Sequence, residues 1–186
     1  MEKPMSETRV QLKHIAIDQI QHGNLAAASF RELGKAAGIK SSSVHYHFQS
    51  RERLLTELLQ DYDLQFFNQL NKLTADTHRP RQRLTALIDI FEQNHAHRRQ
   101  CMSLAYAASP HELSDTNLAA VSTFLEHLED WVAESLSKAS LLPIPKEQLA
   151  CVVVSALEGA LLFDRLYDEP KHLNAARNWV ASLSSY

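Results

Sequence analysis

The sequence predicts an all-α protein, with a small helical domain over residues 1–52 and a larger helical domain over residues 53–186. Two observations carry this prediction. Apolar residues recur three and four positions apart along most of the chain, which is the spacing of helices that bury one face. No segment shows the strict alternation of apolar and polar residues that marks a half-buried strand. A chain of 186 residues is long enough for one compact unit or for two small ones packed together.

Two short helices are expected first. The first covers residues 8–22, with its apolar side chains on one stripe, and it ends at Gly23. The second begins after Ser29, which is a suitable N-cap, with Glu32 three positions later as in a capping box. It extends only to about Ala37, because the glycine that follows is suited to a left-handed helix end.

A third short helix is expected over residues 41–48. Gly38 permits the tight turn before it, and small residues at Gly34, Ala36 and Ala37 allow the second and third helices to cross closely. Three helices of this length are unstable separately, so they must share a small core. The residues expected in this core are Leu12, Ile15, Phe30, Leu33, Ala37, Ile39, Val44 and Phe48.

Six further helical segments fill the rest of the chain, and prolines mark several of the breaks between them. The last but one is apolar around most of its circumference, so we expect it to be buried on several sides. The expected ranges are 51–73, about 84–96, 101–108, about 118–137, 146–167 and from Pro170 through Trp179.

Charge is distributed unevenly along the chain. The whole sequence has a net charge of −3, which is unusual for a protein that binds nucleic acid. Residues 1–53 nevertheless contain eight Lys or Arg side chains against five acidic ones, so this part carries +3 and the remainder carries −6. Four histidines add latent positive charge to the first part. The asymmetry indicates that the two parts do different work.

Several classes of protein are disfavoured by what the sequence lacks. No stretch approaches the ~20 uninterrupted apolar residues that span a bilayer, and the N-terminus lacks the apolar core of a signal peptide. Two cysteines do not make a disulfide framework. We find no phosphate-binding loop, nucleophile motif or paired-histidine zinc motif. We therefore expect a cytoplasmic protein without membrane contact that is not an enzyme and has no cofactor or metal.

The segment from Arg31 to Phe48 is typical of a helix-turn-helix that reads DNA. Its last helix presents short or planar hydrogen-bonding groups, which reach base edges and phosphates when such a helix enters a major groove. The basic side chains around it are expected to contact phosphates. The alternative is a helical module that docks a protein partner without selecting a DNA sequence. The expected DNA contacts are Arg31, Lys40, Ser41, Ser42, Ser43, His45, Tyr46, His47 and Arg51.

This segment and its flanks resemble the TetR family of bacterial regulators over about the first third of the chain. The residues that carry the resemblance are Thr8-Arg9, Ser29, Ala37-Gly38-Ile39, His47-Phe48, Ser50-Arg51 and Leu54-Leu55. Three features depart from the family pattern. His45 stands at the usual tyrosine position with Tyr46 one place later, Arg51 replaces a lysine, and the loop over residues 23–28 is one residue longer and lacks an aromatic residue.

The resemblance implies a fold of about nine helices and a homodimer formed by the last two long helices. It also implies a small-molecule effector bound in the larger domain, and a repressor that leaves a palindromic double-stranded operator when the effector binds. The long helix that starts near Arg51 would transmit the change to the DNA-reading part.

Aromatic and polar residues interleave among the central helices, and such residues suit a pocket for a small apolar or aromatic effector. For each of them the alternative is a place in a filled core. The candidates are Phe66, Phe67, Phe91, His95, Cys101, Met102, Tyr106, Phe124, His127, Trp131 and Phe163.

Cys101 is also a candidate sensor. Arginines precede it and a short helix is expected to start at it, and both features favour the thiolate that reacts with electrophiles and oxidants. The stretch from Cys101 to Glu112 is similar to a TetR subgroup that responds to reactive electrophiles or acrylate-like compounds, which implies a sensing cysteine. The alternative is a small buried hydrophobe, the role that we expect for Cys151.

Overall fold

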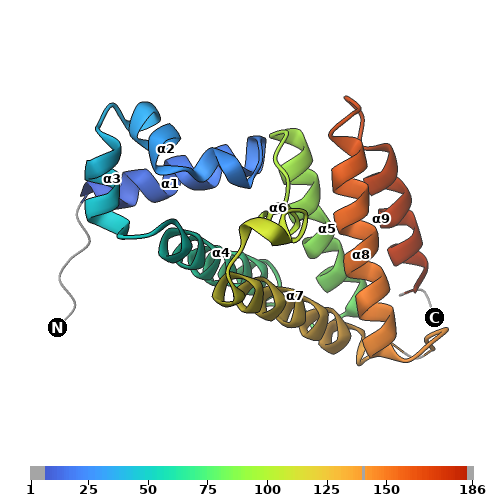
Figure 1. Ribbon diagram of the computed structural model, residues 1–186. Coiled ribbons are helices and arrows are strands. Elements are labelled where there is room, and N and C mark those ends of the chain that lie inside the picture. Colours follow the sequence, from blue (N-terminus) through green and yellow to red (C-terminus); the bar gives the residue numbers. More distant parts are fainter. Residues whose placement is uncertain (1–6, 140, 184–186) are drawn as a thin grey trace. The chain divides into compact units, whose positions relative to one another are not determined.

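The computed structural model describes residues 7–139 and 141–183. Within these ranges it contains nine α helices, two short 3-10 helices and no strand, so the prediction of an all-α fold is confirmed (Figure 1). Residues 1–6, which we counted in the N-terminal domain and in its charge, lie outside the described residues. None of the helices described is long and apolar enough to cross a membrane.

The chain divides into two compact units. Unit 1 consists of Met1–Asp63 and Met102–Val121, and unit 2 consists of Leu64–Cys101 and Ser122–Tyr186. Each unit is therefore built from two separate stretches of sequence. The boundary that we expect at residue 52 divides the chain by function, and it stays a prediction.

Unit 1 begins with α1 (Glu7–His22), α2 (Phe30–Ala37) and α3 (Ser41–Phe48). All three helices lie where the sequence predicts them, to within one residue. Ser29 is the N-cap of α2, because its hydroxyl oxygen accepts a hydrogen bond from the amide of Glu32 at 3.3 Å. Local capping chemistry thus sets where α2 begins.

The loop between α1 and α2 contains a 3-10 helix, η1 (Leu25–Ala28), that the sequence analysis missed. Asn24 caps it, since its side-chain oxygen accepts a hydrogen bond from the amide of Ala27 at 3.3 Å. Leu25 and Ala28 are fully buried. Four residues are too few to show a hydrophobic period, which is why this element escaped prediction.

Two glycines make the turn between α2 and α3. Gly38 has a φ of 70°, in the left-handed region that glycine adopts without strain, as the sequence predicts. Gly34 is required for a different reason, because a Cβ atom there would lie 2.8 Å from the carbonyl oxygen of Ile39. The close crossing therefore depends on Gly34, whereas Ala36 is exposed and contributes nothing to it.

The core of unit 1 is larger than three short helices provide. Of the residues predicted for it, Leu12, Leu33, Val44 and Phe48 are fully buried, and Ile15, Phe30, Ala37 and Ile39 pack against them partly buried. Two other helices contribute most of the remaining core, α4 (Arg51–Leu73) and α6 (Met102–Ala107). Their contributions are Leu54, Leu55, Leu58, Leu59, Met102, Ala105 and Tyr106.

Unit 2 is built around α5 (Pro80–Ala96), α8 (Lys146–Asp164) and α9 (Lys171–Leu183), which pack against one another. The second half of α4 and most of α7 (Asp115–Leu136) also belong to this unit. Arg177 of α9 forms ion pairs with Asp89 and Glu92 of α5.

Helix α8 ends at Asp164, three residues before the predicted end. The Asp164 carboxylate is fully buried and accepts hydrogen bonds from the amides of His172 and Leu173, at 2.9 and 2.8 Å, and from the His172 ring at 2.6 Å. Burial alone would raise the pKa of Asp164, but these bonds outweigh it and hold the pKa below its usual value. A carboxylate at the end of α8 thus caps the first turn of α9.

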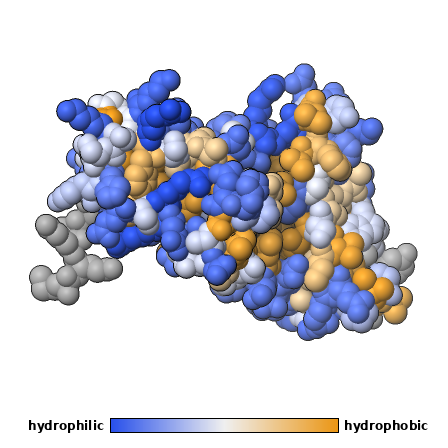
Figure 2. Space-filling model, in the orientation of Figure 1, coloured by the Kyte–Doolittle hydropathy of each residue, from blue (hydrophilic) through white to orange (hydrophobic). Residues whose placement is uncertain are grey.

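One face of α8 is apolar and exposed. Val152, Leu162 and Phe163 are 41% to 54% exposed. Val152 and Phe163 lie eleven positions apart, about three turns of helix, and so face the same side, and Leu162 is the neighbour of Phe163. Figure 2 shows hydrophobic surface gathered over this helix on the face in view. In the single chain the side of α8 toward α5 and α9 is covered, whereas this stripe lies in solvent, so burial of α8 on several sides would need a further partner there.

Replacing Gly34 by alanine should destabilise the protein by about 1–3 kcal/mol, the usual range for overpacking a tight contact. The new methyl group would press on the carbonyl oxygen of Ile39, which is backbone and cannot rotate away. Helix propensity alone predicts the opposite sign, a gain of roughly 0.5–1 kcal/mol. Denaturant unfolding measures the difference, with Lys35→Ala at the exposed neighbouring position as the control. A stabilised Gly34→Ala variant would contradict the close crossing.

Candidate nucleic-acid interface

Helix α3 presents a polar face on the surface of unit 1. Val44 and Phe48, one turn apart, are fully buried and define the inner side of the helix. The remaining positions point outward, and Tyr46 is 81% exposed. The predicted contact residues of this helix therefore share one surface: Ser41, Ser42, His45 and Tyr46 are exposed, and Ser43 and His47 are half-buried.

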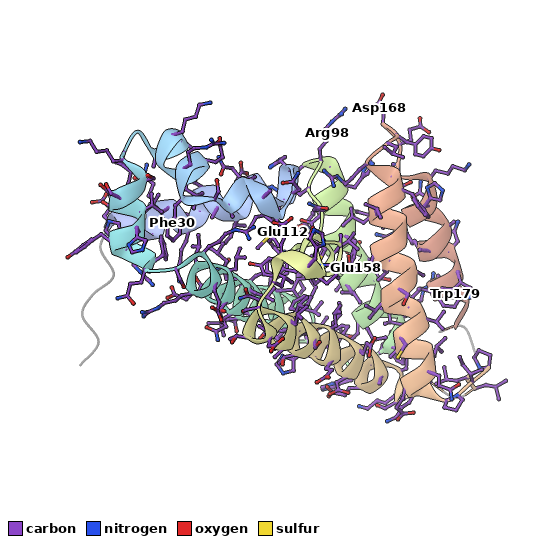
Figure 3. The ribbon with its side chains drawn as sticks, in the orientation of Figure 1. Phe30, Arg98, Glu112, Glu158, Asp168 and Trp179 are labelled. Atoms are coloured by element: carbon purple, nitrogen blue, oxygen red, sulfur yellow. The ribbon has the colours of Figure 1, made fainter. Side chains whose placement is uncertain are left out.

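Planar side chains support one another on this face. Phe30, the first residue of α2, meets the ring of His45 edge-on with centroids 5.9 Å apart (Figure 3). Tyr46 and His47 make a similar edge contact at 5.5 Å. Such contacts restrict the orientations of groups that would otherwise rotate freely, which lowers the entropy cost of placing them against a ligand.

The N-terminus of α3 is suited to bind an anion. Lys40 occupies the N-cap position, and no side chain caps the helix there, unlike at α2. The amides of Ser43 and Val44 are used, since both donate to the Lys40 carbonyl. The helix dipole and the hydroxyls of Ser41 and Ser42 favour a phosphate at this end.

Exposed cations lie on the same unit. The side chains of Lys35 and Lys40 are exposed, and in the described part of the chain neither forms an ion pair. Arg31 is also exposed and forms only a surface ion pair with Glu32 at 3.2 Å, an interaction that contributes little and leaves the guanidinium accessible. Lys35 was not among the predicted contacts, although its place beside the turn could have suggested it.

Arg51 lies in an internal network rather than on this surface. Its guanidinium donates to the carbonyl oxygen of Leu25 at 2.9 Å and pairs with the Glu112 carboxylate at 3.0 Å. Glu112 belongs to a 3-10 helix, η2 (Pro110–Glu112), and is labelled in Figure 3. We expected Arg51 to contact phosphate, but here its hydrogen bonds hold η1 and η2 to the start of α4.

Other N-terminal cations are also engaged inside unit 1. Arg9, Lys13 and Arg53 all form ion pairs with Glu57 of α4. The excess of positive charge counted from the sequence is therefore partly neutralised by an acidic residue just beyond residue 53. The accessible positive charge comes from fewer residues than the count suggests.

The predicted effector residues are divided between the two units. Met102 and Tyr106 belong to the core of unit 1, where the Tyr106 hydroxyl donates to the Leu55 carbonyl at 2.8 Å. In unit 2, four rings gather from the second half of α4 and from α7, with centroids 5.4 to 5.9 Å apart. These rings belong to Phe66, Phe67, Phe124 and His127.

The other candidates are scattered over unit 2. Phe91 is buried, and Trp131 is buried beneath Arg83, whose guanidinium carbon lies 4.6 Å from the ring centroid. Phe163 is exposed on α8. Helical spacing predicts that a residue lies on the buried face of its helix, but it does not predict whether that face packs into the core of unit 1 or of unit 2.

A pocket of about 400 Å³ lies in unit 2 where α5 and α8 end and α9 begins. Of the predicted effector residues it includes His95 alone, whose ring nitrogen Nε2 is 3.1 Å from the Asp164 carbonyl oxygen. Arg98, Arg165 and Glu92 also line it. This lining suits a polar ligand better than the aromatic one that we expected.

One of the two cysteines lies where we did not expect it. Cys101, the candidate sensor, is 1% exposed just before α6. Cys151, expected to be packed, is exposed on α8. The sensor role of Cys101 stays a prediction, and burial of the thiol counts against ready reaction.

Two protein families match the chain. Residues 14–58 match the family described as bacterial regulatory proteins of the tetR family. Residues 80–178, more than half of the 186 residues, match the C-terminal domain of LmrA/YxaF-like transcriptional regulators. The first match contains α2 and α3 whole, and the second contains α5 to α8 whole.

Curated relatives include HTH-type transcriptional repressors named KstR2. The protein from Mycolicibacterium smegmatis is 28% identical over 92 residues, which are 47% of this chain and 45% of that protein. The protein from Rhodococcus jostii is 31% identical over 83 residues, 45% of this chain and 41% of that protein. The match thus spans less than half the length of these curated relatives.

Solved structures share the fold over nearly the full chain. A TetR transcriptional regulator from Legionella pneumophila has a TM-score of 0.87 at 22% identity, covering 97% of this chain and 98% of that one. The reduced form of NemR from E. coli has a TM-score of 0.82 at 17% identity, covering 95% and 97%. At these identities the likeness establishes the fold and no more.

Proposed function

Because this chain belongs to the TetR family of bacterial regulatory proteins, we propose that it is a ligand-responsive transcriptional repressor that binds a palindromic operator as a homodimer. The observation that carries this proposal is the exposed polar face of α3, held in place by the buried side chains of Val44 and Phe48. Family membership places the chain among transcription regulators rather than enzymes. We propose that it acts in the cytoplasm, where an operator is accessible.

In this proposal α3 enters the major groove of the operator. His45 and Tyr46, whose planar side chains are exposed, are placed to read base edges. Ser41 and Lys40 at the helix N-terminus hold a phosphate, which sets the register without reading sequence. Arg31 and Lys35 of α2 are accessible to the neighbouring backbone.

The exposed face of α8 supports the dimer. An apolar stripe containing Val152, Leu162 and Phe163 is costly to leave in water and is suited to pack against a second copy. A Cβ atom added at Gly159 would meet nothing within 4 Å in the single chain, so a partner helix could approach closely there. Two copies related by a twofold axis would present two reading helices to a palindromic site.

We propose that the effector binds in unit 2. Helix α4 supports this route of control, because its first part contributes Leu54 and Leu58 to the core of unit 1 and its last part lies in unit 2. An effector that favours one arrangement of α4 in free energy would change operator affinity, and release of DNA is the expected sign.

The finer proposal is that the effector is a reactive electrophile captured by Cys101. Two arginines, Arg98 and Arg99, stand three and two positions before this residue, and cations near a cysteine favour its reactive thiolate form. Its thiol is buried, so capture requires local opening of the structure.

Operator binding is tested with DNA from upstream of the protein's own gene, by measuring affinity at several salt concentrations. Tight binding with a steep salt slope is expected. Tyr46→Ala should weaken specific binding by about 1–3 kcal/mol, without loss of thermal stability, since Tyr46 is exposed and outside the core. His14→Ala, an exposed side chain on α1, is the control and should bind like the wild type. Unchanged selectivity in Tyr46→Ala would favour a protein-docking module instead.

The dimer is tested by introducing a charge on the α8 stripe. Val152→Glu should convert the protein to monomers, because the carboxylate would be buried without a partner at the interface. Sedimentation or light scattering measures the mass. Leu64→Glu is the matched control, an exposed leucine on α4 that should leave the dimer intact. A monomeric wild-type protein would remove the dimer from the proposal.

The sensing role is tested by treating the folded protein with a mild electrophile and mapping adducts by mass spectrometry. An adduct at Cys101, with loss of operator binding that Cys101→Ser abolishes, is the expected result. Modification at the exposed Cys151 alone would end this part of the proposal.

A further inference from the structure

A cluster of five charged side chains joins α1 to α4 within unit 1. Arg9 and Lys13 come from α1, and Arg53, Glu57 and Asp61 come from α4. We call these five residues the Glu57 cluster. From the sequence, Arg9 forms part of the family resemblance, and the other four members were counted only for their charge.

Glu57 is the centre of this cluster. Its carboxylate accepts a hydrogen bond from the Arg9 guanidinium, and it lies 3.2 Å from the Lys13 ammonium and 3.2 Å from Arg53 Nε. Lys13 is only 6% exposed and also pairs with Asp61 at 2.8 Å. Burial raises the pKa of Glu57, but the bonds from Lys13 and Arg9 outweigh it and keep the pKa below its usual value. The carboxylate is therefore ionised at neutral pH.

Arg9 connects the cluster to the C-terminal end of α3. Its Nε donates to the carbonyl oxygen of His47 at 3.3 Å, and its guanidinium carbon lies 4.9 Å from the centroid of the Phe48 ring. His47 and Phe48 are the last two residues of α3. One side chain of α1 thus contacts both the end of α3 and Glu57 of α4.

Arg53 makes a second connection, at the joint between α3 and α4. Its guanidinium donates to the Gln49 side-chain oxygen at 2.9 Å while it pairs with Glu57. Gln49 has a φ of 63° and a ψ of −42°, and the amide of Ser50 donates to the Phe48 carbonyl at 2.7 Å. This is a γ-turn with positive φ, a strained conformation that persists only where surrounding contacts hold it.

We propose that Glu57 is a positioning residue for operator binding, which sets the angle of α3 by holding Arg9 against its last turn and Arg53 against Gln49. Glu57 does not contact DNA in this role. The inference rests on the proposed function, since it concerns how α3 is presented to an operator. It adds a determinant that lies outside the reading face.

Removing the charge of Glu57 should change operator affinity in opposite directions for a positioning residue and for a simple surface charge. A carboxylate near DNA repels phosphates, so removing an uninvolved one strengthens binding to every sequence. Removing Glu57 as a positioning residue weakens binding to the operator while leaving non-specific affinity unchanged or stronger. The two explanations thus predict opposite effects on operator binding.

The test compares Glu57→Gln with Glu52→Gln in the full chain. Glu52 lies on the same helix with an exposed side chain, and within the described residues it forms no ion pair. Operator and non-specific DNA affinities are measured at fixed salt, alongside thermal unfolding. We expect Glu57→Gln to lose about tenfold in operator affinity, a typical coupling between contacting residues, and Glu52→Gln to bind both DNAs as well as or better than the wild type.

Arg9→Lys keeps the positive charge, but a lysine cannot bond the His47 carbonyl and the Glu57 carboxylate at the same time. It should therefore lose operator affinity by a similar factor. This variant replaces Glu57→Gln in the test if Glu57→Gln does not fold. The double variant should bind the operator no worse than the weaker single variant, because both changes remove one connection. Operator binding by Glu57→Gln that equals or exceeds that of the wild type overturns the inference and leaves the proposed function standing. A wild-type protein without operator selectivity overturns both.

Discussion

An eight-residue helix is too short to persist in water by itself, and the whole candidate reading surface is carried on one. Burial of Val44 and Phe48 is the constraint that orients it, because those two side chains decide which positions of α3 face solvent. The core that receives them is completed by leucines of α4 and by Tyr106, more than fifty residues later in the chain. The presentation of polar groups to DNA therefore depends on apolar packing.

Charge in unit 1 serves two separate purposes. Arg9, Lys13 and Arg51 form ion pairs with acidic residues of the same unit, and each pair joins two separate segments of the chain. Such pairs give little net stability when exposed, but partly buried and hydrogen-bonded pairs specify geometry. In the proposed function, the attraction for DNA is left to Arg31, to the lysines beside the turn and to the N-terminus of α3.

In unit 2 the exposed feature is apolar rather than charged. Helices α5, α8 and α9 pack against one another and leave one apolar stripe of α8 in solvent. In the proposed dimer a second copy would bury this stripe. Asp164 ends α8 and caps α9, so a buried carboxylate joins the end of one helix to the start of the next. Helix α4 belongs to both units and thus connects the proposed effector unit to the reading unit through one continuous hydrogen-bonded element.

The sequence by itself determined the helices of unit 1, the Ser29 cap, the left-handed Gly38 and the polar face of α3. Each depends on residues within about four positions of one another, where spacing and backbone chemistry are decisive. Only the tertiary structure decided that Arg51 turns inward, that Tyr106 joins the first core and that Glu57 gathers three cations. The contacts of Arg51, of Tyr106 and of Arg9 with Glu57 join residues 26 to 61 positions apart in sequence. Only the Arg53–Glu57 pair is local, at four positions apart. No local period encodes which distant partner a side chain will meet.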